Sequence, residues 1–300
     1  MGLVAYVNGA FVPKEEAKIS VYDHGYLYGD GIFEGIRAYN GRIFRLDRHL
    51  DRLYDSARYL MLEIPLSKPE MSAAIVETVR RCGLRDAYIR PVISRGVGDL
   101  GLDPRKCKVP TVVIIVDTIQ LYPKEAYERG LRAVTAAVRK VRPDAVSVQA
   151  KTLNYLNSIL ARLEANRAGV EEALMLQGDG YVCECSADNI FLVRGGEVWT
   201  PPAHLGILQG VTREAVMELA RRQGLPMLER VFTLYDVYTA DECFLTGTGA
   251  EVGPVVEVDS RRIAAGTPGP ITQRLIAAFR DLVMREGTSI YGEEVAERRA

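Results

Sequence analysis

Histidine, cysteine and net charge are all scarce in this chain, and each scarcity excludes a class of function. The three histidines, His24, His49 and His204, are scattered, which disfavours a metal enzyme or a serine-type triad enzyme, so no metal is expected. The five cysteines are odd in number and show no disulfide spacing, which favours a reducing compartment. With 38 Lys+Arg against 39 Asp+Glu, the net charge of -1 argues against a nucleic-acid partner.

Long apolar runs are also missing. The uninterrupted stretch Val112–Val116 is far too short to span a bilayer, so no membrane partner is expected. Residues Met1–Tyr6 lack the basic region and apolar core of a signal peptide. We therefore expect a cytoplasmic protein. Its 48% hydrophobic and 26% charged residues are ordinary for a globular chain, and 300 residues suffice for one large or two medium domains.

Lysine is rare as well, because only eight of the 38 basic residues are lysine. Lys151 is the only lysine in the second half of the chain, and it lies where extended chain gives way to apolar residues at helical intervals from Leu153 onward. A solvated lysine near a helix start is the ordinary interpretation. However, arginine serves as the usual cation here, and only lysine can lose its proton to become a nucleophile. Lys151 is therefore a candidate for amine chemistry.

The first part of the chain, residues 1–119, predicts a small α/β unit. Asn8-Gly9 and Asn40-Gly41 are typical of tight β-hairpins. Apolar spacing predicts helices over about 50–60 and 69–82, the second ending at Gly83. Two further strands are expected at 87–94 and 111–119, the latter almost wholly apolar and so central. Residues 120–130, which contain Pro123 and a charged cluster, are expected to connect the domains.

Residues 131–300 predict a larger unit with a different order of elements. Strands are expected at 131–138, 172–177, 181–184, 189–194, 197–200, 227–232, 242–246 and 252–258. Helices are expected at 153–168, 212–224, 234–240 and 270–286. Mixed strands and helices without strict βαβ alternation indicate an α+β or mixed α/β fold.

Two glycine-rich turns are candidate phosphate sites. The stretch Leu208–Ala215 reads as a tight turn entering a helix, whose first backbone amides can bind an anion, although Thr212 is also an ordinary N-cap. Thr246–Ala250 is a second such turn at a strand end.

Glu184, flanked by two cysteines, is a further candidate. If this stretch is a regular strand, Cys183 and Cys185 both face the core and Glu184 faces the other way. A glutamate at the end of a strand is usually exposed to solvent. A buried Glu184 would need a cationic partner, because unpaired burial of a charge is costly.

Taken in chain order, several segments resemble a class IV (fold type IV) pyridoxal-phosphate aminotransferase, most closely a branched-chain amino acid aminotransferase. The similar segments are Tyr28–Arg37, Arg48–Leu53, Ala87–Pro91, Lys151–Tyr155, Glu184–Phe191, Gly210–Ala215 and Gly247–Glu251. They run through nearly the whole chain. The resemblance implies a two-domain enzyme with the fold of D-amino acid aminotransferases, a small N-terminal α+β domain and a larger, barrel-like C-terminal domain.

The resemblance also implies pyridoxal 5'-phosphate as cofactor and assigns its contacts. Lys151 would form the Schiff base and move the proton at the substrate's α-carbon, and Glu184 would pair with the pyridine nitrogen. Arg52, Val211, Thr212 and Thr248 would hold the phosphate, and Tyr155 would lie by the phenolic oxygen. The full set of implied cofactor contacts is Arg52, Lys151, Tyr155, Glu184, Asp188, Asn189, Leu208, Gly210, Val211, Thr212, Thr248 and Gly249.

The implied reaction moves the amino group of L-leucine, L-isoleucine or L-valine to 2-oxoglutarate. The implied substrate contacts are Tyr28, Phe33, Gly35, Arg37, Tyr88, Arg90, Leu100, Leu102, Tyr122, Thr248, Gly249 and Ala250. Residues 98–102 lack the Arg-x-His carboxylate trap of D-amino acid aminotransferases, and Leu100 and Leu102 instead suggest an apolar pocket completed across a homodimer. A D-amino acid aminotransferase and an R-selective amine transaminase remain alternatives. Outside enzymes, a non-catalytic relative that binds a phosphate ligand and a structural oligomer also remain.

Overall fold

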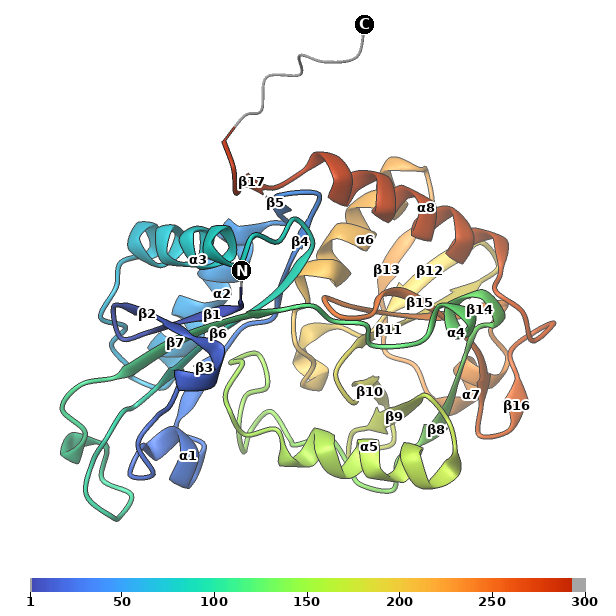
Figure 1. Ribbon diagram of the computed structural model, residues 1–300. Coiled ribbons are helices and arrows are strands. Elements are labelled where there is room, and N and C mark those ends of the chain that lie inside the picture. Colours follow the sequence, from blue (N-terminus) through green and yellow to red (C-terminus); the bar gives the residue numbers. More distant parts are fainter. Residues whose placement is uncertain (1, 293–300) are drawn as a thin grey trace, which may run out of the picture. The chain divides into compact units, whose positions relative to one another are not determined.

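The computed structural model describes residues 2–292, which form two compact units (Figure 1). The first unit comprises residues 2–119, Ala150–Asn154 and residues 283–292. The second comprises Gln120–Gln149 and Tyr155–Leu282. Within the described range, no helix combines the length and apolar character needed to cross a membrane.

The first unit contains an eight-stranded sheet in the order β17-β5-β4-β6-β7-β1-β2, with β3 pairing to β6. Its strands are β1 (Val4–Val7), β2 (Ala10–Pro13), β3 (Gly31–Phe33), β4 (Ile36–Tyr39), β5 (Arg42–Ile43), β6 (Ala87–Ser94), β7 (Thr111–Asp117) and β17 (Thr288–Ser289). Both predicted hairpins are confirmed. Asn8 and Asn40 have φ of 48° and 47° and are each followed by a glycine with positive φ, the geometry that favours Asn-Gly.

Two long helices pack on this sheet (Figure 1). They are α2 (Leu46–Tyr59) and α3 (Lys68–Cys82), and both bury the apolar residues that recur every third or fourth position. A capping box of Ser67 and Glu70 starts α3. The predicted end of this helix at Gly83 is confirmed, since Gly83 is in the left-handed region. The sequence patterns did not predict the short helix α1 (His24–Tyr28) or the short strand β3. This unit also contains two short 3₁₀ helices, Lys14–Glu16 and Pro104–Lys106.

The second unit contains a curled, nine-stranded mixed sheet in the order β10-β9-β8-β15-β14-β11-β12-β13, with β16 pairing to β15 (Figure 1). Its strands are β8 (Leu131–Thr135), β9 (Glu172–Leu176), β10 (Val182–Cys185), β11 (Asn189–Arg194), β12 (Glu197–Thr200), β13 (Met227–Glu229), β14 (Glu242–Gly247), β15 (Glu251–Val258) and β16 (Arg261–Arg262). The pairs β15–β8, β8–β9 and β12–β13 are parallel and the others antiparallel. The mixed α/β fold class is thereby confirmed.

The helices of the second unit are α4 (Lys124–Arg129), α5 (Leu156–Ala168), α6 (Val211–Arg222), α7 (Leu234–Tyr238) and most of α8 (Pro270–Arg285), with a 3₁₀ segment at Ala203–Leu205. The segment 120–130, expected to be a connection, lies within this unit. It contains α4, and Tyr122 and Ala126 are buried in the unit's main core.

Helix α5 buries the opposite face from the one its larger side chains suggest. Its periodicity correctly predicted a helix, but the buried positions are Ala161 and Ala165, which pack with Ala173 and Met175 of β9. Small side chains let the helix approach the sheet closely, so the larger side chains point outward. The exposed apolar residues of this helix are Leu156, Ile159, Leu160 and Leu163.

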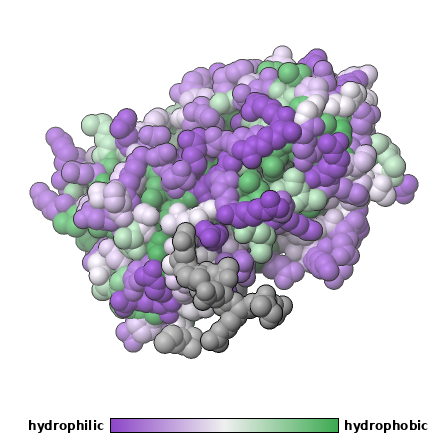
Figure 2. All heavy atoms as spheres, turned by 90° about the horizontal axis from the view of Figure 1, so that it is seen from above, coloured by the Kyte–Doolittle hydropathy of each residue, from purple (hydrophilic) through white to green (hydrophobic). Residues whose placement is uncertain are grey.

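The surface elsewhere differs from this stripe. On the face seen in Figure 2, hydrophilic residues predominate among the described residues and hydrophobic ones occur in small groups between them. Scattered apolar residues of this kind are ordinary on a protein surface and indicate no particular binding role.

Candidate active site

The predicted site residues fall on both units, and in the first unit Arg52 is held by the buried carboxylate of Glu34. Glu34 follows β3, and its carboxylate accepts hydrogen bonds from Arg52 Nε at 2.7 Å and Arg52 Nη2 at 2.8 Å. His49 Nδ1 lies 2.8 Å from Glu34 Oε2. Arg52 and His49 are neighbours on one face of α2, three residues apart, so the helix delivers both side chains to the same carboxylate.

The charge states in this cluster follow from burial. Burial alone would raise the pKa of the Glu34 carboxyl, but the Arg52 guanidinium and His49 outweigh it and hold that pKa well below its usual range. Burial lowers the pKa of His49 despite the opposing charge of Glu34. A neutral imidazole that donates from Nδ1 fits these directions. Arg52 is thus held as a fixed cation on α2, next to the segment that carries Lys151.

Lys151 is fixed by its main chain. Its N–H donates to Ser56 Oγ at 3.0 Å, and its carbonyl accepts from Phe33 N–H at 3.0 Å. The next residue, Thr152, forms a bridge with Ile32 of β3. Lys151 Nζ lies 4.6 Å from the centre of the Phe33 ring. The side chain is half-buried, and its backbone is anchored on both sides, as a residue with a positioned amine requires.

Phe33, Tyr88 and Arg90 form an aromatic and cationic group beside it. The Arg90 guanidinium stacks 4.6 Å from the Phe33 ring centre, and Arg90 Nη2 donates to Tyr88 Oη at 2.5 Å. A Cβ on Gly35 would lie 2.3 Å from Tyr88 Oη, so the space that Gly35 leaves is taken by the tyrosine hydroxyl. Arg37 stacks on Tyr39 at 4.8 Å. The buried Arg90 Nε has no hydrogen-bond partner among the described residues.

Tyr28 and the loop after β6 are joined to each other. The Tyr28 hydroxyl accepts from Gly101 N–H at 2.9 Å, and His24 Nε2 lies 2.9 Å from the Asp99 carbonyl oxygen. These bonds tie α1 to the loop. Leu100 and Leu102 stand out from it, with 65% and 80% of their surface exposed.

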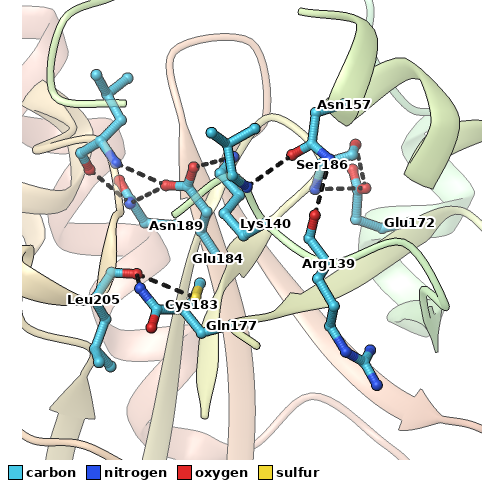
Figure 3. A network of polar contacts seen from close by, with 12 residues as sticks. Arg139, Lys140, Asn157, Glu172, Gln177, Cys183, Glu184, Ser186, Asn189 and Leu205 are labelled. Atoms are coloured by element: carbon cyan, nitrogen blue, oxygen red, sulfur yellow. Dashed lines mark hydrogen bonds and ion pairs between the residues drawn. The ribbon is translucent and has the colours of Figure 1, made fainter. Parts of the chain in front are cut away.

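In the second unit, Glu184 is the centre of a buried polar network (Figure 3). Glu184 Oε2 accepts from Leu208 N–H at 2.9 Å and from Asn189 Nδ2 at 3.2 Å. Glu184 Oε1 lies 2.6 Å from Lys140 Nζ. The expected cationic partner therefore exists, and it is Lys140, which sequence reasoning missed. Its neighbours Arg139 and Arg142 are charged too, so nothing in the local pattern marked this one residue as buried.

The strand that carries Glu184 is not regular. The register shifts between Val182 and Glu184, so Cys183 is an extra residue in a β-bulge. The expectation that Cys183 and Cys185 face the same way was therefore wrong. Cys185 lies in the main core, whereas Cys183 packs with Leu205 and Ile207. Bulges re-aim side chains in this way, and strict alternation cannot anticipate them.

The Asn189 side chain packs closely against the segment that leads into α6. The Asn189 carboxamide donates to the Leu208 carbonyl at 2.8 Å as well as to Glu184. A Cβ on Gly210 would lie 2.3 Å from Asn189 Oδ1, so only glycine is accommodated there. Gly210 is also the N-cap of α6 and provides no side-chain cap. Thr212 is therefore the second helical residue rather than the cap.

The turn after β14 lies against Asp188. A Cβ on Gly247 would lie 1.8 Å from Asp188 Oδ1, which explains the glycine. The buried Thr246 Oγ1 has no hydrogen-bond partner within residues 2–292. Thr248 and Gly249 are half-buried, but the Ala250 side chain lies in the main core. Any ligand contact of Ala250 is thus limited to its backbone.

Tyr122 does not have the environment expected of a substrate contact. It is buried, its hydroxyl donates to Glu172 Oε2 at 2.8 Å, and its ring packs edge-on against Tyr127. Burial and the nearby carboxylates of Asp188 and Glu172 raise the pKa of this hydroxyl well above its ordinary value. These contacts favour a structural role for Tyr122 over the expected contact with the substrate.

The cysteine thiols show no sign of a catalytic role. All five cysteines are free, and burial raises the pKa of the thiols of Cys183, Cys185 and Cys243. Among the described residues, no group of three or more histidine, cysteine or carboxylate side chains is placed to hold a metal ion. Tyr155, at the start of α5, lies close enough to Lys140 to contribute to its charge environment.

Comparison with known proteins adds the family context. The model of the family described as "Amino-transferase class IV" matches residues 31–258. A putative branched-chain-amino-acid aminotransferase of Methanocaldococcus jannaschii is 51% identical over 288 residues, covering 96% of this chain and 99% of its own length. The branched-chain-amino-acid aminotransferase of Escherichia coli K12 is 35% identical, covering 96% of this chain and 95% of its own.

A solved structure agrees with these relatives. The branched-chain aminotransferase of the thermophilic archaeon Thermoproteus uzoniensis, crystallised with norvaline, has a TM-score of 0.89 and 41% identity over 95% of both chains. A second branched-chain amino acid aminotransferase, crystallised with pyridoxamine 5'-phosphate, has a TM-score of 0.90 and 40% identity over 94% of both chains.

Proposed function

Because the chain belongs to the class IV aminotransferase family, we propose that it moves the amino group of L-leucine, L-isoleucine or L-valine to 2-oxoglutarate, giving the branched-chain 2-oxo acids and L-glutamate. The observation that carries the proposal is the buried Glu184 carboxylate, fixed by three donors. A carboxylate held in this way suits a protonated ring nitrogen. The choice of substrate follows the relatives named above.

The residues of the second unit fit pyridoxal 5'-phosphate, the cofactor of this family. Glu184 Oε1 accepts one hydrogen bond from the described residues, and an ionised carboxylate oxygen can accept two. The N-terminus of α6, with Val211 and Thr212 in its first turn, presents backbone N–H groups suited to a phosphate. When bound, the cofactor supplies an electron sink for the substrate's α-carbon. The chain's own part is to hold it and to move the proton.

We assign the proton transfer to Lys151 and the phosphate's cationic contact to Arg52. Lys151 has an amine at the end of a flexible stem and a backbone fixed to Ser56 and Phe33, which suits a group that must reach two atoms in turn. Arg52 is held rigid by Glu34, so its charge is in place before a ligand arrives.

The test of this assignment is Lys151→Ala. Turnover of leucine should fall by several orders of magnitude, in line with the loss of a residue that is both nucleophile and general base. Borohydride reduction of the loaded wild-type protein, followed by peptide mass analysis, should find the cofactor on Lys151. Attachment to Lys140, which is buried against Glu184, would contradict the assignment.

Substrate choice is assigned to the group around Phe33. The ring offers an apolar wall for leucine, whereas Arg90, with an unpartnered buried Nε, offers a cation for the second carboxylate of 2-oxoglutarate. Arg90→Met should therefore raise KM for 2-oxoglutarate much more than KM for leucine. A panel of L- and D-amino acids with 2-oxoglutarate tests the wider proposal, because dominant turnover of D-alanine would favour the D-amino acid alternative.

We further propose a homodimer in which Leu100 and Leu102 complete the partner's pocket. Two exposed apolar groups support it, the loop with Leu100 and Leu102 and the outward stripe of α5. Leu102→Asp should lower leucine turnover far more than cofactor binding. An active monomer in sedimentation analysis, or unchanged leucine kinetics of this variant, would refute the model.

The proposed location is the cytoplasm. The support is chemical: all five cysteines are free, and disulfides form and persist mainly in oxidising compartments. Cell fractionation that finds the native protein in an exported fraction would contradict this proposal.

A further inference from the structure

Lys140 is a buried lysine for which the proposed reaction has so far supplied no role. It follows β8, and its N–H donates to the Leu176 carbonyl at 2.9 Å. Only 6% of its side chain is exposed. Burying an ammonium group is costly unless a partner compensates for the lost water. Its placement therefore calls for an explanation.

The partner is Glu184, and the contact is part of a fixed arrangement (Figure 3). Lys140 Nζ lies 2.6 Å from Oε1, while the other oxygen accepts from Leu208 N–H and Asn189 Nδ2. The three donors come from three separate parts of the chain. The carboxylate plane is thus determined from both sides, and one acceptor direction on Oε1 is left over.

The charge state of Lys140 follows from its surroundings. Burial opposes its positive charge, but the Glu184 carboxylate outweighs burial and raises the pKa of Lys140 above its ordinary value. A lysine kept protonated in this way is no nucleophile and no base. Its chemistry is therefore to present a permanent positive charge to one oxygen of Glu184.

We propose that Lys140 is a positioning residue, which keeps Glu184 ionised and oriented so that its remaining acceptor direction receives the ring N–H of pyridoxal 5'-phosphate. This inference rests on the proposed role of Glu184. The titratable groups that interact with the Glu184 carboxylate include Lys140, Cys183 and Cys185. Lys140 is the cation among these groups, so its removal leaves a buried carboxylate that competes with the ring nitrogen for the proton.

The experiment uses the holoenzyme loaded with cofactor labelled with ¹⁵N in the ring. Lys140→Met keeps the length and apolar stem but removes the charge. The ring ¹⁵N resonance should move from the protonated towards the unprotonated position. The kcat for leucine should fall about 10- to 100-fold, the loss that is typical when a residue that orients a metal ligand is removed. KM for leucine should change little. Lys140→Arg should restore most of the ¹⁵N shift and of kcat.

The matched control is Arg139→Met, the same loss of charge one residue away. Arg139 donates to the Ala136 carbonyl, and its side chain points away from the network in Figure 3. It should leave the ¹⁵N resonance and kcat unchanged. If Lys140→Met does not fold, Lys140→Gln carries the same expectation with a neutral donor at this position.

Glu184→Gln separates the possible failures. If this variant leaves the ring resonance unchanged, the proposed role of Glu184 is wrong. If it moves the resonance and neither neutral Lys140 variant does, the role of Glu184 stands and the inference about Lys140 is overturned. Equal effects of Lys140→Met and Arg139→Met would overturn it too, because they would indicate a general charge effect.

Discussion

Each unit of this protein buries a glutamate against cations, and the two arrangements differ in one respect. The Glu34 carboxylate is fully buried and has four polar contacts, with Arg52 Nε, Arg52 Nη2, His49 Nδ1 and the Gly35 N–H. Glu184 keeps 8% of its side chain exposed and has three such contacts, with Lys140 Nζ, the Leu208 N–H and Asn189 Nδ2. Glu34 is thus sealed by the protein, whereas Glu184 retains a direction for a ligand.

This difference shows how one type of interaction serves two purposes. A buried carboxylate whose partners are all internal stabilises the fold and holds its cations still, which is what a fixed Arg52 requires. A buried carboxylate with one direction open is ready for a positively charged ligand group without further reorganisation. Burial and charge alone do not separate the two cases, but the count of donors and the residual exposure do.

The largest expected effect is on activity, through Glu184→Gln. A neutral amide cannot stabilise a protonated ring, so kcat for leucine should fall by about 10²- to 10⁴-fold, the usual worth of an assisted proton transfer. The cofactor should remain bound. Steady-state kinetics and cofactor titration check both statements. If Glu184→Gln bound the cofactor weakly but had normal kcat at saturating cofactor, Glu184 would have only a structural role, as Glu34 has.

The second effect is on stability, through Glu34→Gln. Removing one partner of a buried ion pair leaves the Arg52 charge uncompensated, which costs about 3–5 kcal/mol in the free energy of unfolding. Denaturant unfolding of the cofactor-free protein measures it, with Glu63→Gln on the exposed surface as control. A loss comparable to that of the control would show that Glu34 is not the sealed counterpart of Glu184.

A third buried carboxylate, Glu172, sharpens the comparison. Its side chain is 2% exposed, and it accepts five hydrogen bonds, from Tyr122 Oη, Ser186 Oγ, Arg162 Nη1 and the N–H groups of Ala173 and Ser186, so it belongs with the sealed type. Tyr122→Phe should cost about 1–3 kcal/mol of stability, the worth of a hydrogen bond to a charged group. Leucine KM should be unchanged. A large rise in the KM for leucine would show that Tyr122 contacts the substrate after all.

The smallest expected effect is on the pH dependence of stability, through the titration of His49 and Glu34. Because burial lowers the pKa of His49, the folded state binds fewer protons than the unfolded state below about pH 6.5, and stability is lost as the pH falls from there, by at most about 1.4 kcal/mol per pH unit. The depressed pKa of Glu34 adds a further loss below about pH 4.5.

The measurement is the free energy of unfolding between pH 7 and pH 5. His49→Asn should flatten the slope in this range, whereas His204→Asn, at an exposed site, should not. An unchanged slope in His49→Asn would show that another group titrates there.

Local patterns predicted much of this fold. The two Asn-Gly hairpins, the ends of α3 and the last helix, expected at 270–286 and found as α8 (Pro270–Arg285), all depend on neighbours within a few residues. The short elements α1 and β3 were missed, because they are held by contacts with distant chain, such as β3 with β6 and with Thr152. Propensity over three to five residues is too weak to predict them.

For the candidate site, the sequence alone determined the chemistry on offer: a rare lysine at position 151, a glutamate between small residues, and two glycine-rich turns. Those residues and their spacing were also sufficient for the family resemblance. What only the tertiary structure decided is which groups meet. The bulge at Cys183, the outward stripe of α5 and the pairing of Lys140 with Glu184 all depend on contacts between different elements. The reason is physical: periodicity reports the faces of one element, whereas burial and ion pairing depend on which elements the topology sets side by side.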